Sequence, residues 1–162
     1  MLHPIAKLTQ HIDLAAYGPS ESRSRLADYT DGGNDVEHIL ADKADDKARA
    51  EFGDKADSQE LIQSLGNLLL IEKSINRSIS NVCYSDKVGP YSKSKFLLTK
   101  CQADTTSEEI GVADKITATV QRLKCWPQWN KTAVAERQAF ITTLAQEVFE
   151  VPAPPPVEAE TA

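Results

Sequence analysis

The sequence lacks any apolar run long enough to cross a membrane. Hydrophobic runs such as Leu68–Ile71 fall far short of the roughly 20 residues that a transmembrane helix needs. The first residues also lack a basic stretch followed by an apolar block, so no secretory signal is visible. We therefore expect a protein of the cytoplasm that makes no use of a membrane.

Cysteines are few, and their spacing excludes two common uses. Cys83, Cys101 and Cys125 lie 18 and 24 residues apart, and no Cys-x-x-Cys pair exists. An odd number at such distances suggests neither a zinc knuckle nor a disulfide framework. We expect three free thiols, in the core or on the surface, in a reduced intracellular protein.

The chain also lacks the positive charge that is typical of nucleic-acid-binding proteins. Its 162 residues, 41% hydrophobic and 26% charged, suit one globular domain, but its net charge is −6. The charge is polarised, because residues 31–60 hold ten acids and four bases, whereas residues 73–100 hold six bases and one acid. The basic segment predicts either a surface for phosphates or a merely solvated helical face.

Hydrophobic spacing and turn residues predict a mostly helical α+β domain with two short strands. Strands are expected at 36–40 and 65–71, separated by an exposed loop or loose helix over 42–57. Helices are expected at 5–16, 21–29, 58–64, 72–79, 91–100, 108–123 and 132–149, with Ser20 and Ser58 as N-caps. We divide the chain into a helical lead-in (1–21), a main domain (22–149) and a Pro- and Glu-rich disordered tail (150–162).

His38 is the best candidate for a chemical role, because histidine accepts protons near neutral pH. It follows Glu37 on the first expected strand, whereas His3 and His11 lie in the terminal segment without acidic or amide companions. A Glu-His dipeptide alone is more typical of a structural or surface histidine. Asn67 at the head of the second strand and Asn76 in the next helix strengthen the candidate, because asparagine is disfavoured inside helices unless it has a role there.

These residues form part of a longer pattern. It runs through Glu37-His38-Ile39-Leu40, Leu65-Gly66-Asn67-Leu68 with Leu70-Ile71, Asn76, Ser80-Asn81, Lys87, Tyr91, Ser94, Trp129 and Ala135-Glu136-Arg137. The pattern resembles the C-terminal domain of GmrSD-type restriction enzymes over roughly residues 22–149. That family belongs to the HNH, or ββα-metal, nucleases, so the resemblance implies a small ββα-metal core surrounded by helices.

The resemblance also implies roles for individual residues. The catalytic pair would be His38, as general base, and Asn67, which would orient the base or brace its loop. Glu37 and Asn76 would hold one divalent cation, Mg²⁺ or Mn²⁺, through oxygen atoms. Residues that would bind DNA or support the site are Arg77, Asn81, Lys87, Lys93 and Lys95. The chain departs from the family at Ala41, where a proline is usual.

The implied activity is metal-dependent hydrolysis of DNA in defence against phage or other foreign DNA, including modified DNA. Relatives commonly carry an N-terminal ParB-like domain that uses nucleotide and senses the target. The sequence has no phosphate-cradling Gly-rich loop, so we expect that partner in another domain or subunit, and a homodimer is plausible for cutting both strands. Two alternatives are a non-catalytic DNA- or protein-binding module on the same scaffold and an interaction protein that docks through its Pro-rich tail.

Overall fold

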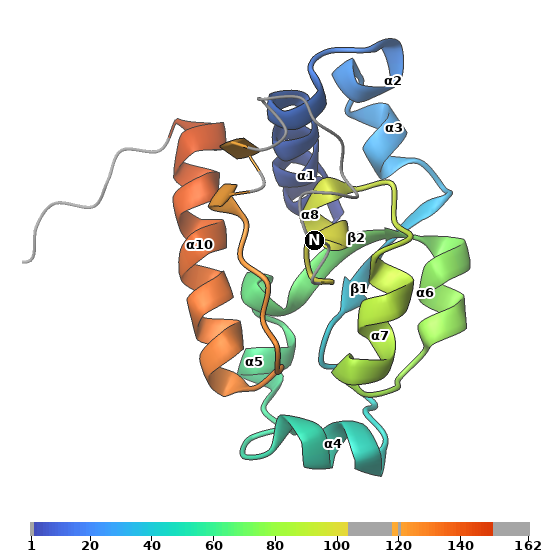
Figure 1. Ribbon diagram of the computed structural model, residues 1–162, viewed down its shortest axis with the longest axis vertical. Coiled ribbons are helices and arrows are strands. Elements are labelled where there is room, and N and C mark those ends of the chain that lie inside the picture. The colour runs from blue at the N-terminus through green and yellow to red at the C-terminus, as the bar shows by residue number, and fades with distance from the viewer. Residues whose placement is uncertain (1, 104–117, 120, 151–162) are drawn as a thin grey trace, which may run out of the picture.

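The computed structural model describes residues 2–103, 118–119 and 121–150, and it confirms the predicted α+β, mostly helical fold class (Figure 1). Its elements in chain order are α1 (Leu2–Tyr17), α2 (Glu21–Ser24), α3 (Ala27–Thr30), β1 (Asn34–His38), α4 (Asp46–Phe52), α5 (Gln59–Ile62), the 3-10 helix η1 (Leu65–Asn67), β2 (Leu68–Glu72), α6 (Lys73–Ile79), α7 (Tyr84–Tyr91), α8 (Leu97–Lys100) and α10 (Lys131–Phe149).

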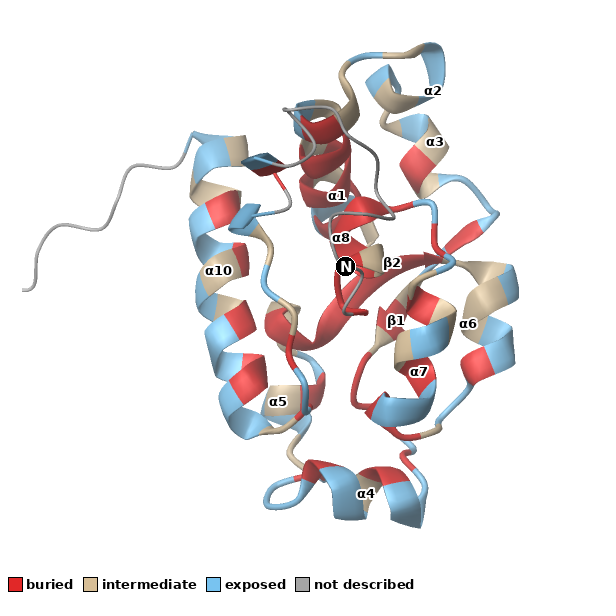
Figure 2. Ribbon diagram, viewed as in Figure 1, coloured by how far each residue is buried: buried red, intermediate tan, exposed pale blue. Residues whose placement is uncertain are grey.

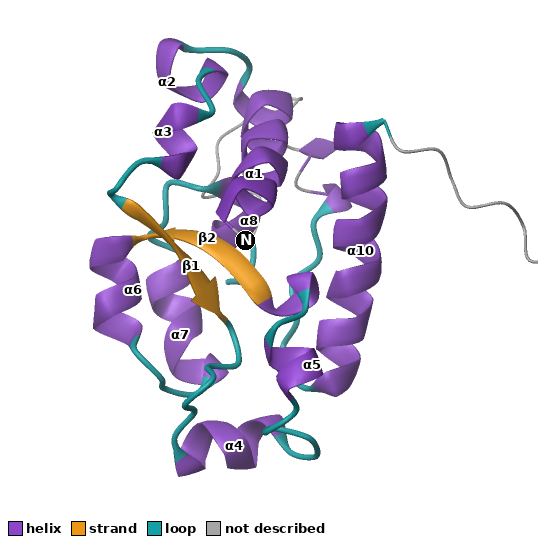
Figure 3. Ribbon diagram, turned by 180° about the vertical axis from the view of Figure 1, so that it is seen from behind, coloured by secondary structure: helices purple, strands orange, loops and turns teal. Residues whose placement is uncertain are grey.

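The strands β1 and β2 pair antiparallel, in a register that places His38 opposite Leu68 and Asn34 opposite Glu72 (Figure 3). Successive side chains of a strand point to opposite faces of a sheet. In β2 the first four residues are all buried, so helices must cover both faces of this small sheet. This explains why β2 is an uninterrupted apolar run instead of an alternating one.

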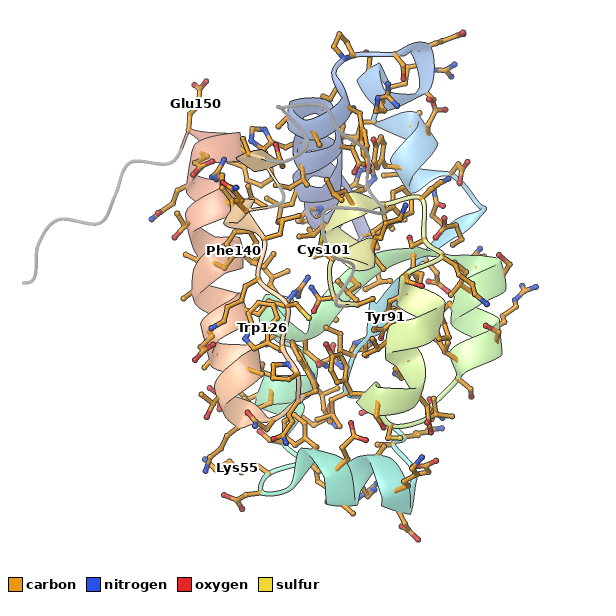
Figure 4. The ribbon with its side chains drawn as sticks, viewed as in Figure 1. Lys55, Tyr91, Cys101, Trp126, Phe140 and Glu150 are labelled. Carbon is orange, nitrogen blue, oxygen red and sulfur yellow. The ribbon has the colours of Figure 1, made fainter. Side chains whose placement is uncertain are left out.

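One face of the sheet packs against α6 and α7. The side chains of Leu69 and Ile71 join a cluster with Ile79 of α6 and with Tyr84 and Tyr91 of α7. Two tryptophans of the segment before α10, Trp126 and Trp129, complete this cluster, and Figure 4 shows that Tyr91 and Trp126 come from opposite sides of it. Since α6 begins directly after β2, β1, β2 and α6 form a compact ββα unit.

The other face of the sheet packs against α1. Leu68 and Leu70 lie with Ile5 of α1, and further along α1 Leu8 and Ile12 meet the apolar side of α8 and α10. On α10, Val134, Ile141 and Leu144 are buried and Val148 is partly buried, so they form one apolar face of the helix. Figure 2 shows these buried stripes along the inner sides of α1 and α10.

Several predicted boundaries need correction in the first half of the chain. The helix expected over 21–29 is two short helices, because Arg25 adopts an extended conformation between them; Ser20 does cap the first. The first strand lies two residues earlier than predicted. Within 42–57, the helical alternative is correct for α4, whose N-cap Asp45 accepts a hydrogen bond from the amide of Ala48 (2.7 Å).

The helix expected over 91–100 is wrong in position. The structure has α7 up to Tyr91 and α8 from Leu97, with a non-helical connection between them. Gly89 and Pro90 were expected to precede a helix, but they form the last turn of α7. A glycine before proline has no Cβ to clash with the proline ring, so the helix continues through this pair before it ends.

Two predictions fall largely or wholly on residues that the structure does not describe, namely the helix over 108–123 and the tail after Glu150. Among the described helices, none is both long and apolar enough to span a membrane. All three cysteines are free thiols, and Cys83 and Cys101 are buried.

Candidate active site

A pocket of about 300 Å³ opens where the end of β1 meets α6. Its lining residues are Val36, Glu37, His38, Ala41, Asp42, Lys43, Asn76, Ser80 and Asn81. Four of the residues that the sequence singled out therefore meet in one place, although they are up to 44 positions apart in the chain (37 to 81). β2 pairs antiparallel with β1, and α6 follows β2 directly, so the end of β1 and the residues in and after α6 come together.

His38 is the last residue of β1, at the strand end that borders the pocket. Its Nε2 atom is buried and has no hydrogen-bond partner among the described residues. An unpaired buried ring nitrogen is uncommon in folded proteins, since buried polar groups almost always have a partner. Nε2 is therefore a ring nitrogen of His38 that the described protein leaves without a partner.

Glu37 is buried, with 5% of its surface exposed, yet it also contributes to the pocket wall. Its Oε1 accepts hydrogen bonds from Lys87 Nζ (2.6 Å) and Tyr91 Oη (2.9 Å). No described residue donates a hydrogen bond to Oε2. Burial raises the pKa of Glu37, and the hydrogen bonds from Lys87 and Tyr91 oppose that rise. The carboxylate is thus held by one oxygen and available through the other.

Lys87 is fully buried under the site. Besides Glu37, its ammonium group donates to the carbonyl oxygens of His38 (2.9 Å) and Ile39 (3.1 Å). Of the two roles predicted for Lys87, this geometry fits support of the site. Contact with a DNA phosphate does not fit a side chain that is 0% exposed and has three acceptors inside the protein.

Asn76 lies in the interior of α6, and its amide nitrogen donates to Asp35 Oδ2 (3.3 Å). Asp35 and Glu37 share one face of β1, so this contact fixes the Asn76 side chain on the face where Glu37 lies. Asn81 is exposed and follows Ser80, whose φ of 47° turns the chain sharply at the end of α6. Both asparagines border the pocket.

Asn67 does not line the pocket; it is fully buried behind it. Its side-chain oxygen accepts hydrogen bonds from the Leu40 amide (2.8 Å) and from Trp129 Nε1 (3.0 Å). Its side-chain nitrogen donates to the carbonyls of Leu40 and Ile62, both at 2.9 Å. The amide therefore uses its full hydrogen-bonding capacity on the protein itself. Of the two predicted roles for Asn67, this arrangement suits bracing of the loop after His38.

The remaining basic residues predicted near the site are exposed: Arg77 on α6, and Lys93 and Lys95 between α7 and α8. The Lys95 ammonium lies over the ring of Phe96, 4.8 Å from its centroid. Lys95 lines a different pocket, and its backbone amide donates to Glu72, at the opposite end of the sheet from His38, so the structure does not bring Lys95 to the site.

In the described part of the chain, no group of three or more His, Cys, Asp or Glu side chains converges as a metal cluster. The predicted pair of Glu37 and Asn76 offers a smaller donor set. Glu37 Oε2 has no hydrogen-bond donor among the described residues, and Asn76 uses its nitrogen, leaving its amide oxygen available. Carboxylate and amide oxygens are suitable ligands for Mg²⁺ or Mn²⁺, so the donor chemistry fits a hard cation completed by water.

Sequence reasoning assigned no role to several residues that shape the site. Tyr91, Trp129 and Arg137 entered only as parts of the family pattern, yet Tyr91 and Trp129 bond directly to Glu37 and Asn67. Asp42 and Lys43 line the pocket, but they entered only the charge counts and were not proposed for the site. Their position just after the His38 loop was the one signal available for them.

Residues 7–144 match the family model described as the C-terminal domain of GmrSD restriction endonucleases. The chain belongs to this family. The match extends from α1 to α10, so it contains the whole ββα unit and the pocket. No curated protein and no solved structure matches the chain. Membership in the GmrSD C-terminal domain family implies a nuclease domain of a restriction endonuclease, with DNA as its substrate.

Proposed function

We propose that this GmrSD C-terminal domain is a metal-dependent DNA endonuclease of the HNH, or ββα-metal, type. The observation that carries the proposal is the meeting of Glu37, His38 and Asn76 in one pocket at the ββα unit. A carboxylate, an imidazole and an amide oxygen form a set suited to phosphodiester hydrolysis, in which a base activates water and a cation bears charge. The family membership supports the same conclusion.

In the proposed mechanism, His38 takes a proton from a water molecule through its unpaired Nε2. The water oxygen then bonds to phosphorus, while the bond from phosphorus to the leaving deoxyribose oxygen breaks. Glu37 and Asn76 would hold the divalent cation, Mg²⁺ or Mn²⁺, through Oε2 and the amide oxygen. When bound, that cation would neutralise the negative charge that develops around phosphorus.

The protein's other residues keep this set in place. Lys87 and Tyr91 fix Oε1 of Glu37, so that Oε2 remains available to hold the cation. Asn67 holds the main chain of Leu40, two residues beyond His38. The exposed Arg77 of α6 would contact phosphates of the DNA beside the scissile bond, and the exposed Lys93 and Lys95 would contact phosphates farther along the duplex.

Nicking of supercoiled plasmid by the full chain tests the proposal. We expect nicking in the presence of Mg²⁺ or Mn²⁺, its loss on chelation with EDTA, and its loss in the His38→Ala variant by at least about 100-fold, the contribution typical of a general base. The exposed His3→Ala variant is the matched control and should nick like the wild type.

The outcomes separate the enzyme from its alternative. If wild type and His38→Ala leave plasmid equally intact with every divalent metal tried, the catalytic proposal fails. Binding of the same DNA by both proteins without cleavage would then favour a non-catalytic DNA-binding module on the nuclease scaffold.

The biological setting is part of the proposal and rests on the family alone. We propose restriction of foreign or modified DNA, with target sensing supplied by an N-terminal ParB-like domain or subunit that uses nucleotide. Cutting both strands with one site per chain calls for a second copy, so a homodimer belongs to the same proposal.

A further inference from the structure

We propose that three residues, one just before α10 and two in its first half, act as positioning residues for His38, although none of them borders the pocket. The three are Trp129, Arg137 and Gln138, which we call the η1 clamp. The inference rests on the proposed function of His38 as a general base. It adds a route, from α10 through η1 and Asn67, by which a remote helix sets where that base lies.

Arg137 is the centre of the η1 clamp. It is fully buried, and its Nη1 donates to the carbonyl oxygens of Leu65 (3.2 Å), Gly66 (2.8 Å) and Leu68 (2.9 Å). No described carboxylate pairs with it. Burial lowers the pKa of Arg137 to about 10, so the guanidinium stays charged at neutral pH. Hydrogen bonds from a charged donor are stronger than neutral ones, and here they gather the carbonyls of one short turn.

A buried arginine without a counter-ion is a costly way to stabilise a core, since an apolar residue of similar volume is often as stable or more so. The Nε and Nη2 atoms of Arg137 are also buried without a partner in the described structure. The residue is therefore poorly explained by stability alone. Its hydrogen bonds to the carbonyls of residues 65, 66 and 68 instead fix the geometry of η1.

Two more contacts hold the same turn. Gln138 Oε1 accepts a hydrogen bond from the Gly66 amide (2.7 Å), and Trp129 Nε1 donates to Asn67 Oδ1 (3.0 Å). The backbones are so close that a Cβ on Gly66 would lie 2.3 Å from the carbonyl oxygen of Val134. The η1 clamp therefore fixes the position of residues 65–68 against α10.

Asn67 transmits this position to the loop after His38. Its main-chain oxygen accepts from the Ile39 amide (2.9 Å), and its side chain bonds both the amide and the carbonyl of Leu40. Ile39 and Leu40 are the two residues that directly follow His38. A displacement of η1 would thus move the end of β1 itself. Misplacement of a reacting group by about 1 Å can cost a factor of about 100 in rate.

The test compares Arg137→Met, Arg137→Lys and Gln138→Leu in the full chain, with Arg122→Met as the matched control. Arg122 is an exposed arginine of the described chain whose partner is Glu147 (2.8 Å). For Arg137→Met and Gln138→Leu we expect kcat for plasmid nicking to fall roughly tenfold or more, with KM for DNA nearly unchanged. Arg137→Lys, which keeps the charge, should retain more of kcat than Arg137→Met, and Arg122→Met should match the wild type.

A second readout does not depend on cleavage. Hydrogen exchange at the Ile39 and Leu40 amides should become at least about tenfold faster in Gln138→Leu and Arg137→Met, and should be unchanged in Arg122→Met. Folded variants with wild-type kcat and wild-type exchange at these two amides would overturn the η1 clamp.

The two proposals can fail separately. If the wild type cleaves no DNA, the proposed function fails, and the exchange rates still decide whether α10 positions the loop. If Arg137→Met does not fold, Gln138→Leu decides alone, because it removes from a half-buried side chain only the hydrogen bond with the Gly66 amide and a long one (3.4 Å) to the Thr142 hydroxyl. Loss of thermal stability with unchanged kcat and unchanged local exchange would mean that the η1 clamp is purely structural.

Discussion

Among single residues, Lys87 holds both the Glu37 carboxylate and the main chain of His38. A buried ammonium is costly unless its charge is paired and its donors are used. Lys87 meets both conditions through Glu37 and the carbonyls of His38 and Ile39. One side chain therefore sets the carboxylate and the main chain of the proposed base at the same time.

Replacement of Lys87 by methionine should destabilise the domain by about 3–5 kcal/mol, because it leaves the Glu37 carboxylate buried and unpaired. The measurement is the free energy of unfolding in urea at pH 7. Lys131→Met is the matched control, since Lys131 pairs with Asp54 (3.1 Å) on an exposed surface. An exposed ion pair contributes at most about 1 kcal/mol.

A double variant separates the lost charge pair from lost packing. Glu37→Gln removes the charge that Lys87→Met leaves behind, so the double variant should be more stable than Lys87→Met alone. Equal free energies of unfolding for Lys87→Met and Lys131→Met would show that the buried pair is not important for stability.

At the scale of elements, the approach of η1 to α10 depends on one glycine. Gly66→Ala should destabilise the domain by about 1–3 kcal/mol, because the new Cβ would meet the Val134 carbonyl and force the backbones apart. Thermal or urea unfolding measures the effect. Gly32→Ala is the control: the φ of Gly32 lies outside the range +20° to +160°, and a Cβ added there would meet no atom within 4 Å. There alanine should stabilise by about 0.4–1 kcal/mol. Effects of the same sign at both glycines would contradict the close-approach argument.

Sequence patterns identified most elements because local chemistry dominates there. A short apolar run, the N-cap Ser20 and apolar spacing give β2, α2 and α10 a local signal. The misplaced helix between residues 91 and 100 shows the limit of such signals. Whether Gly89 and Pro90 end a helix or begin one depends on Tyr84 and Tyr91, which anchor α7 in the core through contacts distant in sequence.

The candidate site shows the same division between local and tertiary signals. Glu37, His38 and Asn76 were chosen for side-chain chemistry, and the structure brings them to one pocket. The part played by Arg137 was not predictable in this way. Its contacts with η1 span about 70 positions, so no local pattern reveals them, and an arginine within an amphipathic helix is expected to face solvent.

At the scale of the whole molecule, the basic segment is weaker as a DNA surface than its sequence suggests. One of the six bases of residues 73–100, Lys87, is fully buried and cannot contact DNA. Exposed ion pairs join Arg49 of α4 to Asp57, and Lys47 of α4 to Asp86, the one acid of the basic segment. Among the described residues, Lys43 is the one lysine or arginine that lines the pocket, so little positive charge faces a phosphate there.

The stability of the whole fold should depend on pH through Asp13 of α1. This buried carboxylate joins three helices, because it accepts hydrogen bonds from Tyr29 Oη of α3 (3.0 Å) and from the Leu97 amide of α8 (3.0 Å). Desolvation raises the pKa of Asp13 from 3.8 to about 6, and the two hydrogen bonds limit that rise.

The sign of the pH effect follows from proton binding. Between about pH 4 and pH 6 the folded state binds more protons at Asp13 than the unfolded state does, so the free energy of unfolding falls as the pH rises through this interval and levels off above it. The loss from this one group is about 3 kcal/mol.

Asp13→Asn cannot ionise, so urea unfolding of both proteins at pH 4, 5, 6 and 7 isolates the effect. The wild type should lose stability relative to Asp13→Asn by roughly that amount across the series, even though the asparagine gives up one of the two hydrogen bonds at every pH. A constant difference between the two proteins would mean that Asp13 titrates alike in the folded and unfolded chains, and that its burial between α1, α3 and α8 carries no electrostatic cost.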